Sequence, residues 1–114
     1  MPFIDLKTTA KIDKNQQSKL TADFGKIITI IPGKTERWLM LNFSEECRMA
    51  FSGNADSDTA YINVELLGST TDAVYDKLTE AITDAVSNAL SISPERIYVK
   101  YAECDHWGWA GKNF

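Results

Sequence analysis

Apolar and polar residues alternate along four short segments of the chain, and this period of two predicts β-strands at residues 3–7, 36–41, 61–65 and 95–100. Between the strands of each pair, apolar residues return every three or four positions, as they do on one face of an amphipathic helix. These stripes are Leu20, Phe24, Ile27, Ile28 and Ile31 in the first pair and Val74, Leu78, Ala81, Ile82, Ala85 and Ala89 in the second. The predicted order is therefore strand, helix, strand, twice.

Polar residues mark the ends of both predicted helices. Asp13 followed by Gln16 is a capping pattern for the first helix, and the Pro-Gly pair at 32–33 ends it. Ser69 with Asp72 offers the start signal for the second helix. A helix that joins two strands of one sheet normally makes a right-handed crossover between parallel strands. We therefore expect one parallel pair of strands in each half.

The two halves also resemble each other in sequence. Segment 3–7 ("FIDLK") matches segment 61–65 ("YINVE") at a shift of 58 residues, and segment 36–41 ("ERWLML") matches 95–100 ("ERIYVK") at a shift of 59. Nearly constant spacing over two separate stretches indicates duplicated units. We predict pseudo-repeats at about 2–53 and 60–114 within a single domain that spans 1–114.

Strand alternation assigns these residues to two faces of a sheet. One face is almost entirely apolar, and we expect both helices to cover it, which gives an α+β fold with a four-stranded mixed sheet. Two helices cover only one face, so the other face and the sheet edges need protection, most simply from sister subunits. That other face mixes aromatic with charged and polar side chains: Phe3, Asp5, Lys7, Trp38, Met40, Asn42, Tyr61, Asn63, Glu65, Tyr98 and Lys100.

Composition excludes several classes of protein. The 114 residues carry a net charge of −4, and no basic block is interleaved with aromatic residues, so we expect no nucleic-acid partner. The longest apolar run, Ile27–Ile31, is too short to span a bilayer, and no signal-peptide pattern opens the chain. The expected location is cytoplasmic, with export without a signal peptide left open. Cys47 and Cys104 form no CxxC motif, and His106 stands alone, so no metal or other cofactor is expected.

Five sequence features occur in order along the chain: a proline after Met1, a "GK" at 33–34, "MAFSG" at 49–53, "ISPERIYVKY" at 92–101 and a closing "WGWAGKNF" at 107–114. Together they resemble the macrophage migration inhibitory factor family of the tautomerase superfamily. The resemblance covers essentially the whole chain. It implies two β-α-β units per subunit and a homotrimer in which three sheets surround a central channel.

For Pro2, the resemblance implies a catalytic role after Met1 is removed. The proline nitrogen would then be the acid/base that moves a proton in keto–enol tautomerisation. An α-amino group titrates at about 7.7–8.0, and burial or a nearby cation lowers that value, so a terminal amine suits this task near neutral pH. The alternative interpretation is that Pro2 simply begins a strand, where proline is tolerated.

The resemblance also assigns substrate-binding roles. Lys34 would bind a substrate carboxylate and lower the pKa of Pro2, although a lysine after a helix also suits the helix dipole. The backbone N–H of Leu67 would hold a substrate oxygen, and Tyr98 would come from a neighbouring subunit. An asparagine of mammalian relatives is replaced by Lys100, which either adds a cation to the pocket or points to solvent. Aromatic residues that would line the pocket are Trp38, Trp107, Trp109 and Phe114.

The expected function is interconversion of the keto and enol forms of phenylpyruvate-like 2-oxo acids, with a small aromatic 2-oxo acid as substrate. One alternative is a cytokine-like trimer that binds a protein receptor and keeps a vestigial pocket. Another is hydration or decarboxylation of small acids, for which related proteins carry arginines in the pocket. Arg37, Arg48 and Arg96 do not fall at recognised pocket positions, which disfavours that alternative. Asp58 and Tyr61 stand where mammalian relatives have a CxxC motif, so no redox role is carried over.

Overall fold

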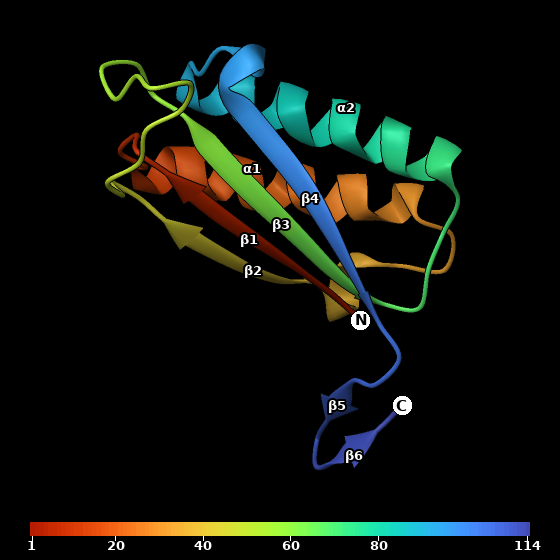
Figure 1. Ribbon diagram of the computed structural model, residues 1–114. Helices are drawn as coiled ribbons and strands as arrows, with labels where there is room; N and C mark the ends of the chain where they lie inside the picture. The colour runs from red at the N-terminus through yellow and green to blue at the C-terminus, as the bar shows by residue number, and fades with distance from the viewer.

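The computed structural model describes residues 1–114 as a four-stranded sheet with two helices packed side by side against one of its faces (Figure 1). The strands are β1 (Pro2–Thr8), β2 (Met40–Ser44), β3 (Ala60–Leu67) and β4 (Ile97–Cys104), and the helices are α1 (Lys14–Ile27) and α2 (Asp72–Leu90). A small hairpin, β5 (Gly108–Trp109) and β6 (Lys112–Asn113), projects beyond one end of the sheet (Figure 1). One-turn 3-10 helices cover Ile28–Ile30, Glu36–Trp38 and Pro94–Arg96.

The strand order is β2-β1-β3-β4, which confirms the α+β class and the mixed sheet. β1 runs parallel to β2, and β3 runs parallel to β4, because a helix crosses over within each pair. The two units meet where β1 pairs with β3 in the antiparallel direction. The first strand of the chain therefore lies inside the sheet, with a hydrogen-bonded neighbour on each side.

The two units repeat in register. Phe3 pairs with Met40, and Tyr61 pairs with Tyr98, so both strands of the second unit follow those of the first by 58 positions. The one-turn helices before β2 and β4 keep the same shift. The shift of 59 expected for the second strand of each unit is therefore wrong by one residue. The difference matters because an odd shift would exchange the inward and outward residues of a strand.

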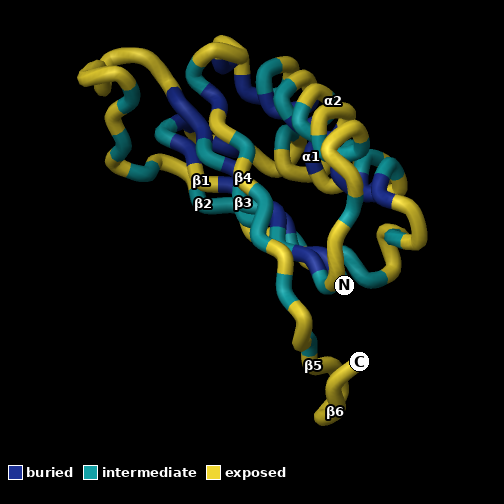
Figure 2. The backbone as a smooth tube through the Cα atoms, turned by 45° about the vertical axis from the view of Figure 1, so that its right-hand side comes forward, coloured by how far each residue is buried: buried dark blue, intermediate teal, exposed yellow.

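The core lies between the helices and the inner face of the sheet. Strand residues on this face of β1 and β3 are fully buried, and so are Leu20 and Phe24 of α1 and Leu78 and Ile82 of α2. Burying one such side chain contributes about 1.5–3 kcal/mol, so this face supplies the main stabilisation of the fold. Figure 2 shows the buried segments along the central strands and the inner sides of the helices, whereas the hairpin is exposed.

The segment before β2 differs from the prediction. Residues 36–41 were expected to be a strand, but Glu36–Trp38 form a 3-10 turn and the strand begins at Met40. Trp38 is therefore not a strand residue on the open face of the sheet. The open face still carries exposed apolar groups, because Met40 is 68% and Tyr98 is 61% exposed. It remains uncovered within one chain, as the pattern predicted.

The helix ends agree with the sequence signals in one case and correct them in the other. At α1, the Asp13 side chain accepts from the backbone N–H of Gln16, and the reciprocal bond completes a capping box. At α2, the cap is Thr71, whose hydroxyl accepts from the N–H of Val74, so Ser69 is not the cap that was expected. Neither helix is long and apolar enough to cross a membrane.

The C-terminal end of α2 offers a test of backbone strain. Ser91 follows the helix with φ of 56°, in the left-handed region that glycine adopts without a steric cost. We expect Ser91→Gly to raise the free energy of unfolding by about 0.5–1 kcal/mol. Ser87→Gly, inside the same helix, is the matched control and should lower it by about 0.5 kcal/mol. Urea denaturation at one fixed protein concentration measures both, and a loss of stability in Ser91→Gly would contradict the strain argument.

Candidate active site

The candidate site lies at the end of the sheet where β1 begins and where β3 and β4 end. Pro2 is the first residue of β1, is buried, and stands opposite Leu66 of β3. A proline is tolerated there because the first position of a strand can lack one ladder donor. The N-terminus and the start of the hairpin segment meet at this end of the sheet (Figure 1).

A cleft of about 370 Å³ opens beside Pro2. This volume is at the lower end of the range for small-molecule sites. Its walls include all three tryptophans of the chain, Trp38, Trp107 and Trp109. The structure therefore brings together, around Pro2, three of the aromatic residues that were predicted to line a pocket. The other lining residues are Met1, Phe3, Arg37, Leu39, Met40, Glu65 and Gly108.

Met1 occupies the space next to Pro2 and contacts the two polar groups predicted for the site. The backbone N–H of Leu67 donates to the Met1 carbonyl oxygen at 3.1 Å. The ammonium of Lys34 donates to the Leu67 carbonyl oxygen at 3.0 Å. Burial, followed by the hydrogen bond and the charge of Lys34, lowers the pKa of the Met1 amine to about 6. This corner of the structure therefore disfavours a positive charge on an amine.

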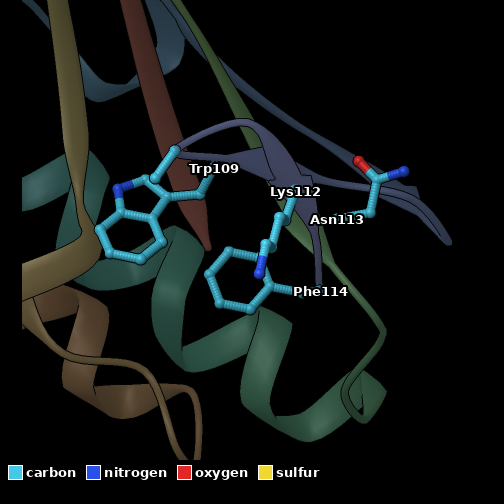
Figure 3. A pocket seen from close by; sticks show the side chains of 5 residues that line it. Trp109, Lys112, Asn113 and Phe114 are labelled. Carbon is cyan, nitrogen blue, oxygen red and sulfur yellow. The ribbon is translucent and has the colours of Figure 1, made fainter.

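The hairpin holds further aromatic rings against the one-turn helix. Trp109 meets Trp38 edge to face at 4.9 Å between ring centroids, and Phe114 lies 6.0 Å from Trp38. The backbone N–H of Phe114 donates to the carbonyl oxygen of Trp107 at 3.0 Å. Figure 3 shows Trp109 and Phe114 at a second hollow, of about 320 Å³, with Asn113 pointing away from the rings. Phe114 thus supports the tryptophans, and it lines this hollow rather than the Pro2 cleft.

Tyr98 and Lys100 lie away from the Pro2 of their own chain. They stand six and four residues before the end of β4 at Cys104, which places them about 20 and 13 Å from the Pro2 end of the sheet. Both side chains are exposed on the open face. The structure therefore does not bring either residue into the cleft of the same chain.

Tyr98 is nevertheless held in a defined position. Its ring meets Phe51 edge to face at 4.9 Å. Arg96 fixes the segment that carries Phe51, because its guanidinium donates to the carbonyl oxygens of Phe51, Asn54 and Ser57 at 3.2, 2.9 and 3.0 Å. Arg96 therefore has a structural role, consistent with its place outside the recognised pocket positions.

Arg37 lines the cleft, although the sequence analysis did not assign it to a pocket. Its guanidinium carbon lies 4.8 Å from the centroid of the Trp38 ring, and both residues line the cleft. In a strand, neighbouring residues point to opposite faces, but in a 3-10 turn they are only about 120° apart, so both side chains reach one wall. The only signal in the sequence was the adjacency of Arg37 to a tryptophan predicted to line the pocket.

Histidine, cysteine and acidic side chains do not form a cluster of the kind that binds metal ions. No group of three or more of them comes together in a way that could hold a metal ion. At the end of β4, the thiol of Cys104 donates to the carbonyl oxygen of His106 at 3.4 Å. This contact involves the backbone of His106 and not its imidazole.

Comparison with known proteins places this geometry in context. A family model described as macrophage migration inhibitory factor (MIF) matches residues 1–114. Among curated proteins, no sequence matches the chain significantly.

Solved structures are similar over nearly the whole chain. The crystal structure of Leishmania major MIF2 has a TM-score of 0.93 and 32% identity, and the match covers 100% of this chain and 97% of that one. Macrophage migration inhibitory factor of Toxoplasma gondii has a TM-score of 0.90 and 23% identity, with 98% and 99% coverage. A fused 4-OT symmetric trimer shares the fold alone, with a TM-score of 0.85, 17% identity and coverage of 97% and 94%.

Proposed function

Because this chain belongs to the macrophage migration inhibitory factor family, whose fold serves tautomerase and cytokine-like roles, we propose that it is a keto–enol tautomerase of phenylpyruvate-like 2-oxo acids. One observation carries the proposal. The residue attached to the Pro2 nitrogen, Met1, is held by the N–H of Leu67 and lies beside Lys34. These are a donor and a cation, the two groups that an oxo acid needs, and they face the place where the nitrogen would react.

The position of Met1 supports this proposal. Its carbonyl oxygen accepts the Leu67 N–H, and its amine approaches the Lys34 ammonium. Removal of Met1 would turn the Pro2 nitrogen from a tertiary amide into a free secondary amine. The same step would leave the Leu67 N–H and Lys34 facing the vacated space. We infer that the carbonyl and carboxylate oxygens of the substrate take the place of Met1.

The proposed mechanism is a proton transfer at Pro2. In the keto-to-enol direction, its neutral nitrogen takes a proton from the carbon next to the carbonyl, and the protonated nitrogen then delivers that proton to the carbonyl oxygen and returns to its neutral form. Burial and Lys34 both disfavour the ammonium form, so the amine is a base near neutral pH. Lys34 binds the carboxylate, and the indoles of Trp38, Trp107 and Trp109 pack against the aryl ring.

We further propose that Tyr98 and Lys100 serve the cleft of a neighbouring subunit in a homotrimer. Three features support this assembly: the exposed face of the sheet, the position of both residues far from their own Pro2, and the fold shared with a symmetric trimer. The Oδ1 atom of Asn63 on the open face is buried without a hydrogen-bond partner, so a neighbouring chain could also supply that partner.

The first test separates a free from a blocked Pro2. Processed protein should tautomerise enol phenylpyruvate, and protein that retains Met1 should be slower by about 10²–10⁴-fold, the usual contribution of a general base. Pro2→Gly should fall between the two, because a primary amine is a weaker base. Intact mass identifies each form, and loss of the enol absorbance measures the rate. Equal rates for the processed and Met1-bearing forms would refute Pro2 as the catalyst.

A second test uses the cation beside the amine. In processed protein, Lys34→Met removes a positive charge that disfavours the protonated amine, so the pKa of Pro2 should rise by about one unit. The acidic limb of the pH–rate profile then moves to higher pH, and less of the base form is present at neutral pH. Lys77→Met, on the exposed side of α2, is the charge-matched control and should leave the profile unchanged. An unmoved limb in Lys34→Met would show that this lysine does not act on the nitrogen.

A third test asks whether two subunits build each site. Trimers made only of the Pro2→Gly variant, or only of the Tyr98→Ala variant, should have reduced tautomerase activity. If the subunits are unfolded and reassembled together, some clefts combine an intact Pro2 from one chain with an intact Tyr98 from its neighbour. We expect activity above the sum of the two separate preparations. No gain on mixing, with native mass spectrometry confirming mixed trimers by their intermediate masses, would contradict the shared site.

A further inference from the structure

We propose that Arg37 is a second anion-binding group of the Pro2 cleft, and that the cleft prefers small acids with a second acidic group beyond the aromatic ring. The inference rests on the proposed function for the reaction that such an acid undergoes. The claim that the cleft binds a second anionic group rests on the geometry of Arg37 and does not depend on the reaction. It also revises the sequence-based expectation, in which no arginine belonged to the pocket.

Arg37 is exposed, but it lines the cleft and its side chain contacts another residue of the wall. Its guanidinium carbon lies 4.8 Å from the centroid of Trp38, within the range of a cation–π interaction. Trp38 is itself fixed by the edge of Trp109 at 4.9 Å. Stacking on a supported ring restricts the side chain before a ligand arrives, so less conformational entropy is lost when an anion binds.

The guanidinium has no acidic partner within the chain. The ion pairs of the structure join Lys7 to Asp5 and Lys19 to Asp23, and no hydrogen bond leaves the Arg37 side chain. An arginine offers five N–H donors in a planar fork that fits a carboxylate with two parallel bonds. These donors are therefore free for a ligand.

Two acidic residues, Glu36 beside Arg37 in the chain and Glu65 in the cleft lining, make other contacts. The Glu36 carboxylate lies against the backbone of α1 at Gly25, where an added Cβ would collide with it. Glu65, which lines the cleft, accepts a hydrogen bond from the side-chain amide of Asn63 at 3.0 Å. Neither carboxylate forms an ion pair with Arg37. Glu65 keeps its negative charge in the cleft, and the guanidinium keeps its positive charge on the wall beside Trp38.

One cation, Arg37, thus lies on the cleft wall against the face of Trp38. A second cation, Lys34, stands outside the lining but beside the amine of Met1, which does line the cleft. An acid that fits both carries one carboxylate next to the reacting carbon and a second anionic group, with an apolar ring between them. An acid with a single carboxylate uses only the Lys34 end.

Three ligands and three variants test this preference in processed protein. The ligands are cinnamate, 4-carboxycinnamate and the neutral isostere 4-carbamoylcinnamate, none of which can tautomerise. Binding is followed by tryptophan fluorescence, because every tryptophan of the chain lines this cleft. The variants are Arg37→Met, Arg37→Lys and the charge-matched control Lys77→Met on the exposed side of α2.

We expect the unmodified protein and Lys77→Met to bind 4-carboxycinnamate about three- to tenfold more tightly than cinnamate or the carbamoyl analogue, as for a partly exposed Arg–carboxylate pair. Arg37→Met should abolish this preference and leave cinnamate affinity within about twofold, and Arg37→Lys should keep part of it. A preference that survives in Arg37→Met, or its absence from the unmodified protein, overturns the proposal. Binding without any tautomerase activity would instead refute the proposed function and leave the anion site standing.

Discussion

The pairing of β1 with a strand on each side is the constraint on which the rest of the molecule depends. Because β1 lies between β2 and β3, the beginning of the chain is fixed inside the sheet and its backbone cannot fray. Strands at this end then supply the surroundings of the first residues, with Leu67 at the end of β3 and Cys104 at the end of β4. A terminal amine is usually mobile and solvated. Here the amine of Met1 is held, partly buried and close to a lysine, and the proposed chemistry needs the same surroundings for the nitrogen of Pro2.

The walls of the cleft come from segments outside the main sheet. A one-turn helix presents Arg37 and Trp38, and a short hairpin presents Trp109 against them. The sheet therefore holds Pro2, and the irregular segments shape the cleft beside it. This division resembles the general pattern in which a rigid scaffold positions variable loops. It also means that changes in specificity need not alter the core.

The regular parts of the fold could be predicted from the sequence because each had a periodic signal that agreed with its surroundings. Strand alternation in β1 and β3 and the stripe through Leu20 and Phe24 correctly identified the buried face. Strand alternation gave a wrong prediction at Trp38, because a 3-10 turn of only three residues precedes the strand and is too short to show its own period. It also failed at Arg37, because its contact with an aromatic face depends on turn geometry rather than on spacing. Pro2, Lys34 and Leu67 were assigned to the candidate site through family resemblance, because no local pattern links residues so far apart in sequence.

The 58-residue repeat has a consequence for how many sites such a sheet can carry. The position equivalent to Pro2 in the second unit is Ala60, a buried residue at the start of β3. Its nitrogen is an ordinary peptide amide, whatever residue stands there, because the chain continues on both sides of it. Joining two units in one polypeptide therefore leaves one amine-bearing end for every two repeats. Linkage makes the pairing of the units permanent. Under the proposed function, the second unit then need not supply a base, and the corresponding end of its strand is open to change.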